Sequence, residues 1–151
     1  MTNHEQRAKE LFLSGYNCAQ AVFAAFAPEL GMDERAAAKL ASSFGGGMAG
    51  MREVCGAVSG MLMAAGVLYG YDDPSAREEK KLHYAHCRAM ADAFRAENGS
   101  IVCRELLGLD RDAKPAAPSE RTAEYYKKRP CAELVAQAAA ILDNYMRENP
   151  V

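Results

Sequence analysis

Apolar positions recur with helical spacing along this chain and predict a succession of helices. The first helix is expected over residues 3–14, and its apolar face is formed by Ala8, Leu11 and Phe12. Gly15 interrupts this pattern, and Asn17 can cap the second helix. That helix should end near Pro28 or Gly31, and its apolar positions are Cys18, Ala21, Val22, Ala25 and Phe26.

The middle of the chain predicts three more helices. Asp33 can cap a helix that leads toward Phe44 through the apolar positions Ala36, Leu40 and Ala41. A glycine cluster follows, and then a helix over about residues 54–69. The Asp-Asp-Pro sequence at residues 72–74 predicts a stop and a restart. The longest helix should therefore cover residues 74–98, with an apolar face of Leu82, Cys87, Met90 and Phe94.

The last third of the chain predicts shorter elements and one long helix. Ser100 can cap a short helix, and residues 110–120, DRDAKPAAPSE, are typical of a polar connector. A second short helix is expected around Tyr125 and Tyr126, which we interpret as core and rim residues. A final helix should cover residues 130–146, because proline suits a helix start.

Composition agrees with this pattern. Alanine occurs 29 times, whereas Val, Ile and Thr together occur 11 times, which favours helices over strands. We predict a single domain over residues 1–151 with an all-α fold. It should be a compact bundle of about six to eight helices around a buried central helix rich in glycine and alanine.

Charge and cysteine content narrow the function. With 18 Lys and Arg against 20 Asp and Glu, no basic field is available to attract nucleic acid. The polar start, MTNHEQRAKE, lacks the order of a secretory signal, so we expect a cytoplasmic protein. In a reducing compartment the five cysteines are more often metal-binding, catalytic or buried than joined in structural disulfides.

The segment FGGGMAGMREVCGAVSG, residues 44–60, contains the spacing of a nucleotide-binding loop. Gly45, Gly47 and Gly50 match G-x-G-x-x-G, but that motif must follow a strand, and the preceding AAAKLASSF predicts helix. We expect no nucleotide.

The 18 uncharged residues between Glu53 and Asp72 are just long enough to suggest a membrane span. Amphipathic helices on both sides favour a buried central helix instead, and no membrane span is expected. Within this run, the Gly56-x-x-x-Gly60 and Gly66-x-x-x-Gly70 spacings allow close helix packing.

Four cysteines fall in the first turns of predicted helices: Cys18, Cys55, Cys103 and Cys131. A helix start stabilises a thiolate, and positive charge lies near in sequence at Arg52, at Arg104 and at residues 127–129. Each cysteine also begins an apolar stripe, so the sulfurs should point inward and can form one sulfur-rich pocket. Ordinary core packing is the alternative. No C-x-x-C motif is present, so a shared site has to be assembled across the chain.

The chain resembles the C_GCAxxG_C_C family of redox-active proteins over nearly its whole length. The matching segments are GYNCAQAV, FGGGMAG, CGAVSG, GSIVCRELLG and KRPCAELV. The resemblance implies a small helical protein whose Cys18, Cys55, Cys103 and Cys131 are redox-active or bind metal. A related domain accompanies split-Soret cytochromes and is associated with an iron-sulfur cluster. Haem is not implied, because the chain has no C-x-x-C-H motif.

Three functions stay open. In the first, the four cysteines bind an iron-sulfur cluster or another thiolate-ligated metal for electron transfer or redox sensing. Gly45, Gly46, Gly47 and Gly56 would then allow close backbone approach to the cofactor. In the second, two of the cysteines form a reversible disulfide. In the third, the chain is a non-catalytic interaction module that self-associates or docks a partner. The redox partner is unknown in each case.

Cys87 lies outside the four-cysteine pattern. His83 precedes it by four residues on one helical face, a spacing that can bind metal, and His86 is near. Packing or solvent exposure is the favoured interpretation of these three residues.

Overall fold

The computed structural model describes residues 3–110, 112, 114–115 and 117–151. Within these residues the fold is all-α, as predicted, and its only strand-like feature is an isolated antiparallel bridge between Val54 and Val102. The helices are α1 (Asn3–Leu13), α2 (Cys18–Ala25), α3 (Ala27–Leu30), α4 (Glu34–Ala41), the 3-10 helix η1 (Ser42–Phe44), α5 (Gly56–Tyr69), α6 (Arg77–Asn98), α7 (Cys103–Leu106), α8 (Ala123–Lys128) and α9 (Cys131–Glu148).

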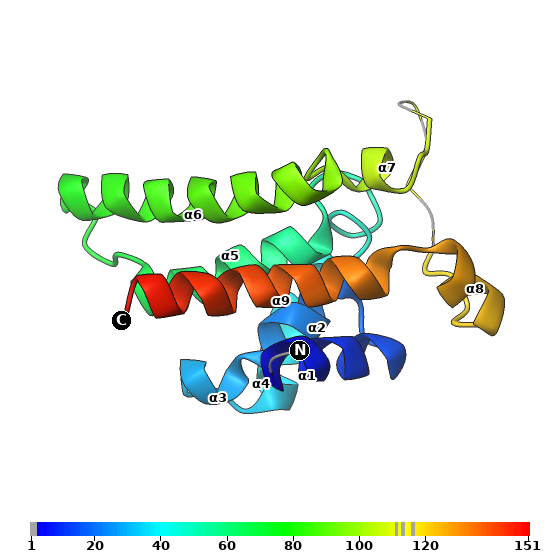
Figure 1. Cartoon of the computed structure of the whole chain (residues 1–151), viewed down its shortest axis with the longest axis horizontal. Helices are drawn as coiled ribbons and strands as arrows, with labels where there is room; N and C mark the ends of the chain where they lie inside the picture. The colour runs from blue at the N-terminus through cyan, green and yellow to red at the C-terminus, as the bar shows by residue number, and fades with distance from the viewer. Residues whose placement is uncertain (1–2, 111, 113, 116) are drawn as a thin grey trace.

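Helices α2, α5 and α9 form the centre of the bundle (Figure 1). Helix α2 packs against α1, α4, α5 and α9, and α5 packs against α2, α6 and α9. Small side chains make these contacts close, because alanine dominates the buried face of α2 and Ala136, Ala138 and Ala139 are buried on α9. The largest fully buried side chains are Phe12, Phe23, Phe26, Phe94, Met61 and Met90.

Helix α5 is the predicted central helix, and two glycines let it approach α2. A Cβ atom at Gly60 would lie 2.6 Å from the Ala19 carbonyl oxygen, and one at Gly56 would lie 3.1 Å from the Ala19 amide nitrogen. Gly60 therefore requires glycine, and a side chain at Gly56 would fit only if its neighbours shifted by a few tenths of an ångström. The second predicted packing pair is different, because a Cβ atom at Gly66 would meet nothing within 4 Å.

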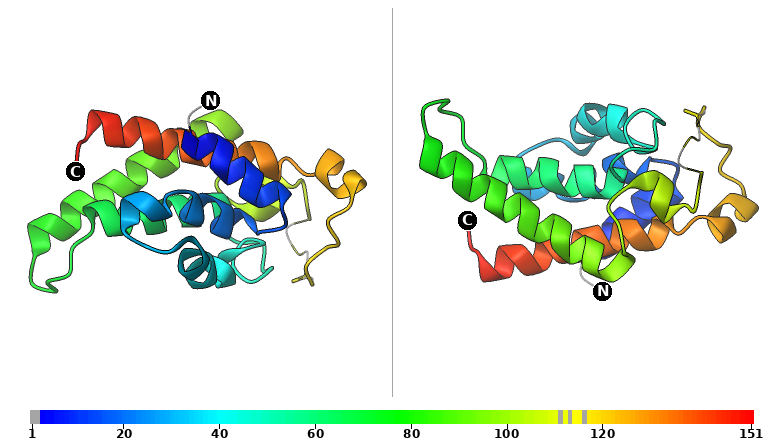
Figure 2. Two further views of the ribbon diagram at one scale, coloured as in Figure 1. Left: turned by 90° about the horizontal axis from the view of Figure 1, so that it is seen from below. Right: turned by 90° about the horizontal axis from the view of Figure 1, so that it is seen from above.

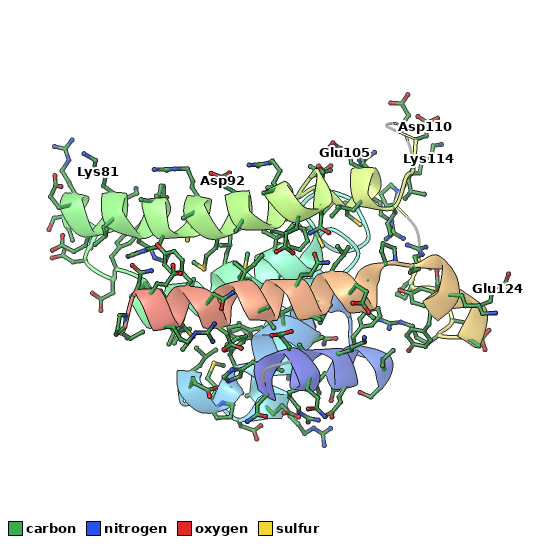
Figure 3. All side chains as sticks on the ribbon, in the orientation of Figure 1. Lys81, Asp92, Glu105, Asp110, Lys114 and Glu124 are labelled. Atoms are coloured by element: carbon green, nitrogen blue, oxygen red, sulfur yellow. The ribbon has the colours of Figure 1, made fainter. Side chains whose placement is uncertain are left out.

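The long helix α6 covers the bundle with only part of its length. Met90 and Phe94 are buried as predicted, but Leu82 is 59% exposed, which corrects the expected apolar face. The N-terminal part of α6 extends past the helices beneath it (Figure 2), and Leu82 belongs to this part of the helix. Charged side chains such as Lys81 and Asp92 point away from the bundle along its outer face (Figure 3).

Helix boundaries follow local capping signals where those signals are strong. Asn17 forms a full capping box with Gln20 at the start of α2, and the Asp33 side chain accepts from the Ala36 amide at the start of α4. The Ser100 prediction is wrong, because Val102 is the residue that precedes α7. Ser100 Oγ instead accepts a hydrogen bond from the Val102 amide.

The second predicted helix divides at Phe26 into α2 and α3, so the described residues form nine α-helices. One further expectation is corrected. Leu40 is exposed, because α4 packs through Ala37, Ala38 and Ala41. None of the helices in the described part of the chain is long and apolar enough to span a bilayer.

Candidate functional site

The four cysteines singled out in the sequence all stand at helix starts. Cys18, Cys103 and Cys131 are the first residues of α2, α7 and α9, and Cys55 is the N-cap residue of α5. These helices begin toward the same end of the molecule (Figure 1), and all four cysteines line one cavity of about 290 Å³. The structure therefore assembles from distant segments the sulfur-rich pocket that the pattern predicted.

The Val54–Val102 bridge brings two of these cysteines together. The Cys55 amide donates to the Ile101 carbonyl at 2.7 Å, and the Cys103 amide donates to the Glu53 carbonyl at 2.6 Å. The start of α5 is thus tied to the start of α7. Helical periodicity gives no signal for this pairing, so the sequence pattern does not predict it.

The glycine cluster forms a tightly folded loop beside the cysteines. Five consecutive residues, from Gly46 to Gly50, adopt a positive φ angle. A Cβ atom at Gly47 would lie 2.6 Å from Cβ of Cys103, and one at Gly45 would overlap the Asn17 side chain. The residues Gly45, Gly46, Gly47 and Gly56 all line the cavity. Their close approach is to the protein itself, and their predicted cofactor role stays a prediction.

Cys18 and Cys131 line the same cavity, and each has the largest influence on the pKa of the other. The interaction with the Cys18 thiol, more than the positive charge of Arg129, Arg121 and Arg52, lowers the pKa of Cys131 to about 7 against the effect of burial. The same interaction and burial raise the pKa of Cys18 well above its usual range. Near neutral pH, Cys131 is therefore the member of this pair that ionises, and Cys18 stays a thiol.

Cys55 and Cys103 are held as thiols. Burial raises the pKa of Cys55 to about 12, although the amides of Ala57 and Val58 act in the opposite direction. Burial also raises the pKa of Cys103, and the hydrogen bond from Arg52, with Nη1 3.8 Å from Sγ, opposes that rise. Cys131 is thus the one member of the quartet whose pKa is lowered.

Three arginines supply positive charge to the cavity: Arg52, Arg121 and Arg129. Arg52 and Arg129 belong to the charges noted in the sequence, whereas Arg104 turns to the Met51 and Arg52 carbonyls and to Glu53. Arg121 was missed, because it follows the polar connector and no pattern marks it. Its guanidinium donates to the carbonyls of Phe12 and Tyr16.

Aromatic rings hold two of these arginines in place. The Arg121 guanidinium carbon lies 4.4 Å from the Phe12 ring centroid and 5.0 Å from that of Tyr125. Arg129 lies 5.4 Å from the Tyr125 ring centroid. Tyr125, expected only as a core or rim residue, therefore lines the cavity and orients its charges.

Metal ligation was tested against the same geometry. Among the residues that the structure describes, no three His, Cys, Asp or Glu side chains are grouped closely enough to hold a single metal ion. The Cys87 sulfur lies 3.5 Å from Nε2 of His83, while Nδ1 of His86 is hydrogen-bonded to the Tyr145 hydroxyl. Cysteine thiolates are suitable ligands for an iron-sulfur cluster. The four cysteines are not grouped closely enough, however, to bind one single metal ion.

The family model described as "Putative redox-active protein (C_GCAxxG_C_C)" matches residues 16–145, a range that contains all four cavity cysteines. The chain belongs to the C_GCAxxG_C_C family. The resemblance seen in the sequence is thereby confirmed, and with it the coarse assignment to redox-active proteins. No curated protein and no solved structure matches the chain.

Proposed function

We propose that this C_GCAxxG_C_C protein is a thiol-based redox protein in which Cys131 and Cys18 form a reversible disulfide. The observation that carries the proposal is that Cys131 and Cys18, at the starts of α9 and α2, line one cavity in which the Cys18 thiol lowers the pKa of Cys131. A thiolate beside a second thiol is the arrangement that thiol-disulfide exchange requires.

The two cysteines have different roles in this exchange. The Cys131 thiolate attacks one sulfur of a substrate disulfide, a mixed disulfide forms, and the other substrate sulfur leaves as a thiolate. The Cys18 sulfur, on losing its proton, then attacks the Cys131 sulfur and releases the second substrate thiol. Two cysteine thiols are oxidised and one substrate disulfide is reduced. The reverse steps, with two substrate thiols, restore the dithiol.

Counting thiols before and after mild oxidation tests this function. Under denaturing conditions the reduced chain should give five thiols and the oxidised chain three. Peptide mapping should place the new bond between Cys18 and Cys131. Cys18→Ser and Cys131→Ser should each abolish the difference, whereas Cys87→Ser should keep it. An unchanged thiol count in the wild-type chain would contradict the proposal.

A thiolate-ligated iron-sulfur cluster is the second candidate, and the shared cavity of the four cysteines favours it. Cys18, Cys55, Cys103 and Cys131 would be the ligands. In a cluster, the thiolates are distributed over several irons, so they lie farther apart than the ligands of one ion. When bound, such a cluster would supply one-electron chemistry.

Metal and sulfide analysis separates the two candidates. Cluster binding predicts coloured protein after anaerobic purification, with iron and acid-labile sulfide in comparable amounts. Colourless protein that stays free of metal after reconstitution would remove this candidate. If all four Cys→Ser variants changed neither metal content nor thiol oxidation, a non-catalytic interaction module would be the remaining function.

A further inference from the structure

The cavity beside Cys131 has an unbalanced charge. Its described lining includes three arginines, Arg52, Arg121 and Arg129, and no aspartate, glutamate, lysine or histidine. None of these arginines forms an ion pair with a carboxylate of the described residues. The chain as a whole carries a formal net charge of −2, so the positive charge here is a local property of the site.

The groups of the described residues leave this charge uncompensated. Arg121 donates to two backbone carbonyls, which are neutral, and Arg129 faces an aromatic ring. The Cys131 thiolate supplies at most one negative charge against three guanidinium groups. A cavity of low polarity with excess positive charge attracts an anion more strongly than an exposed cluster does.

The size of the cavity limits what can enter. About 290 Å³ lies at the lower end of pockets that hold small molecules. Three arginines are well suited to carboxylates, because the planar guanidinium can donate two parallel hydrogen bonds to the two carboxylate oxygens. Since Cys131 lies in the same lining, a carboxylate held by the arginines would leave the rest of the molecule beside the sulfur.

We propose that the substrate of the Cys131–Cys18 pair is a small disulfide that carries carboxylate groups. This inference rests on the proposed thiol-disulfide function and adds the charge class of its substrate. The arginines bind a carboxylate, the Cys131 thiolate attacks the nearer substrate sulfur, and one carboxylate-bearing thiolate leaves. Cys18 closes the protein disulfide and releases the second substrate thiol, so two cysteine thiols are oxidised for each disulfide reduced.

Three small disulfides of different charge test the substrate class: dithiodipropionate, which is anionic, bis(2-hydroxyethyl) disulfide, which is neutral, and cystamine, which is cationic. For each reagent, the rate at which it oxidises the folded protein is divided by the rate at which it oxidises the urea-unfolded chain. The expected order is anionic, neutral, cationic, with about a tenfold or larger preference for the anion over the neutral reagent at low salt. Added salt should reduce this preference.

Arg129→Gln is the informative variant, because Arg129 contacts the site mainly through the Tyr125 ring and its loss should leave the fold intact. It should lower the anion preference several-fold while the neutral disulfide still oxidises the pair. Arg35→Gln removes an equal charge from the exposed surface of α4 and should change nothing. Equal preference in wild type and Arg129→Gln would overturn the inference.

A second measurement does not depend on disulfide formation. In the Cys18→Ser variant, peptide mass spectrometry gives the ratio of alkylation rates at Cys131 by anionic iodoacetate and neutral iodoacetamide. Relative to the unfolded chain, this ratio should exceed one and should fall with Arg129→Gln. A ratio of one would overturn the inference even if Cys18 and Cys131 form a disulfide. A high ratio with no disulfide would instead contradict only the proposed exchange, leaving an anion-binding cavity.

Discussion

Cys18 and Cys131 line the same cavity, although one lies near the beginning of the chain and the other near its end. Each is the first residue of its helix, α2 for Cys18 and α9 for Cys131. Cys55 and Cys103 line this cavity too. The pair therefore depends on how α2 and α9 pack, and its reactivity can be altered at either helix.

Alkylation of Cys131 should follow a titration with a midpoint near its pKa of about 7. Cys18→Ala removes the thiol that contributes most to the lowering, so the midpoint should rise toward the ordinary value of 9.0. A complete return to 9.0 would reduce the thiolate fraction at neutral pH by roughly fiftyfold. Rates with iodoacetamide across pH measure the change. Cys87→Ser is the control and should leave the profile of Cys131 as it is.

Stability should fall in alkaline solution because of Cys55. The unfolded chain releases this thiol proton near pH 9.0, whereas the folded chain retains it up to about 12, so the folded state binds more protons in this range. The Cys55 contribution to the free energy of unfolding should decrease by about 1.4 kcal/mol per pH unit between pH 9.0 and about 12. Urea unfolding at several alkaline pH values should show a shallower decline for Cys55→Ala. Identical slopes in the two chains would contradict this assignment.

Gly60 and Gly66 should respond in opposite ways to alanine. In Gly60→Ala the new Cβ atom would lie 2.6 Å from the Ala19 carbonyl oxygen, which is backbone and cannot move aside easily. We expect a loss of about 1–3 kcal/mol in unfolding free energy. In Gly66→Ala nothing lies within 4 Å, and we expect a gain of about 0.5–1 kcal/mol from helix propensity. Thermal or urea unfolding measures both.

Substitutions at two helix-capping residues can distinguish an effect on the stability of the fold from an effect on the reactivity of Cys18 and Cys131. Asn17→Ala and Asp33→Ala each remove a side chain that caps a helix, and each should cost about 1 kcal/mol. Asn17 also precedes Cys18 and donates to the Ser42 carbonyl, so its loss should slow oxidation of the Cys18–Cys131 pair. Asp33 caps α4, and its loss should leave that rate unchanged. Equal effects of the two variants on oxidation would show that capping acts on the site only through overall stability.

The parts of this fold that the sequence predicts correctly are those with local signals. Helix periodicity, the caps at Asn17 and Asp33, and the position of four cysteines in first turns depend on residues close together in sequence. The convergence of the cysteines could be anticipated because helices that each bury a stripe beginning at a cysteine bring those ends inward. Leu82 shows the limit of this reasoning, since periodicity does not reveal how far a neighbouring helix extends.

The remaining features depend on contacts between distant segments. The pairing of Val54 with Val102 follows from tertiary packing, and two single residues carry no recognisable strand pattern. Met48 and Ala49 adopt positive φ angles that their residue types do not favour, so local preference gives no warning of the loop. Arg121 reaches the site only because the carbonyls at the end of α1 and the following turn accept its hydrogen bonds.

The distance in sequence between Cys18 and Cys131 also bears on heat resistance. A covalent bond between these residues would enclose most of the chain in one ring and restrict the unfolded ensemble far more than the folded one. For a ring of roughly this size, the chain-entropy model gives a stabilisation of about 4–5 kcal/mol. The protein would then report its own oxidation state as a shift in melting temperature.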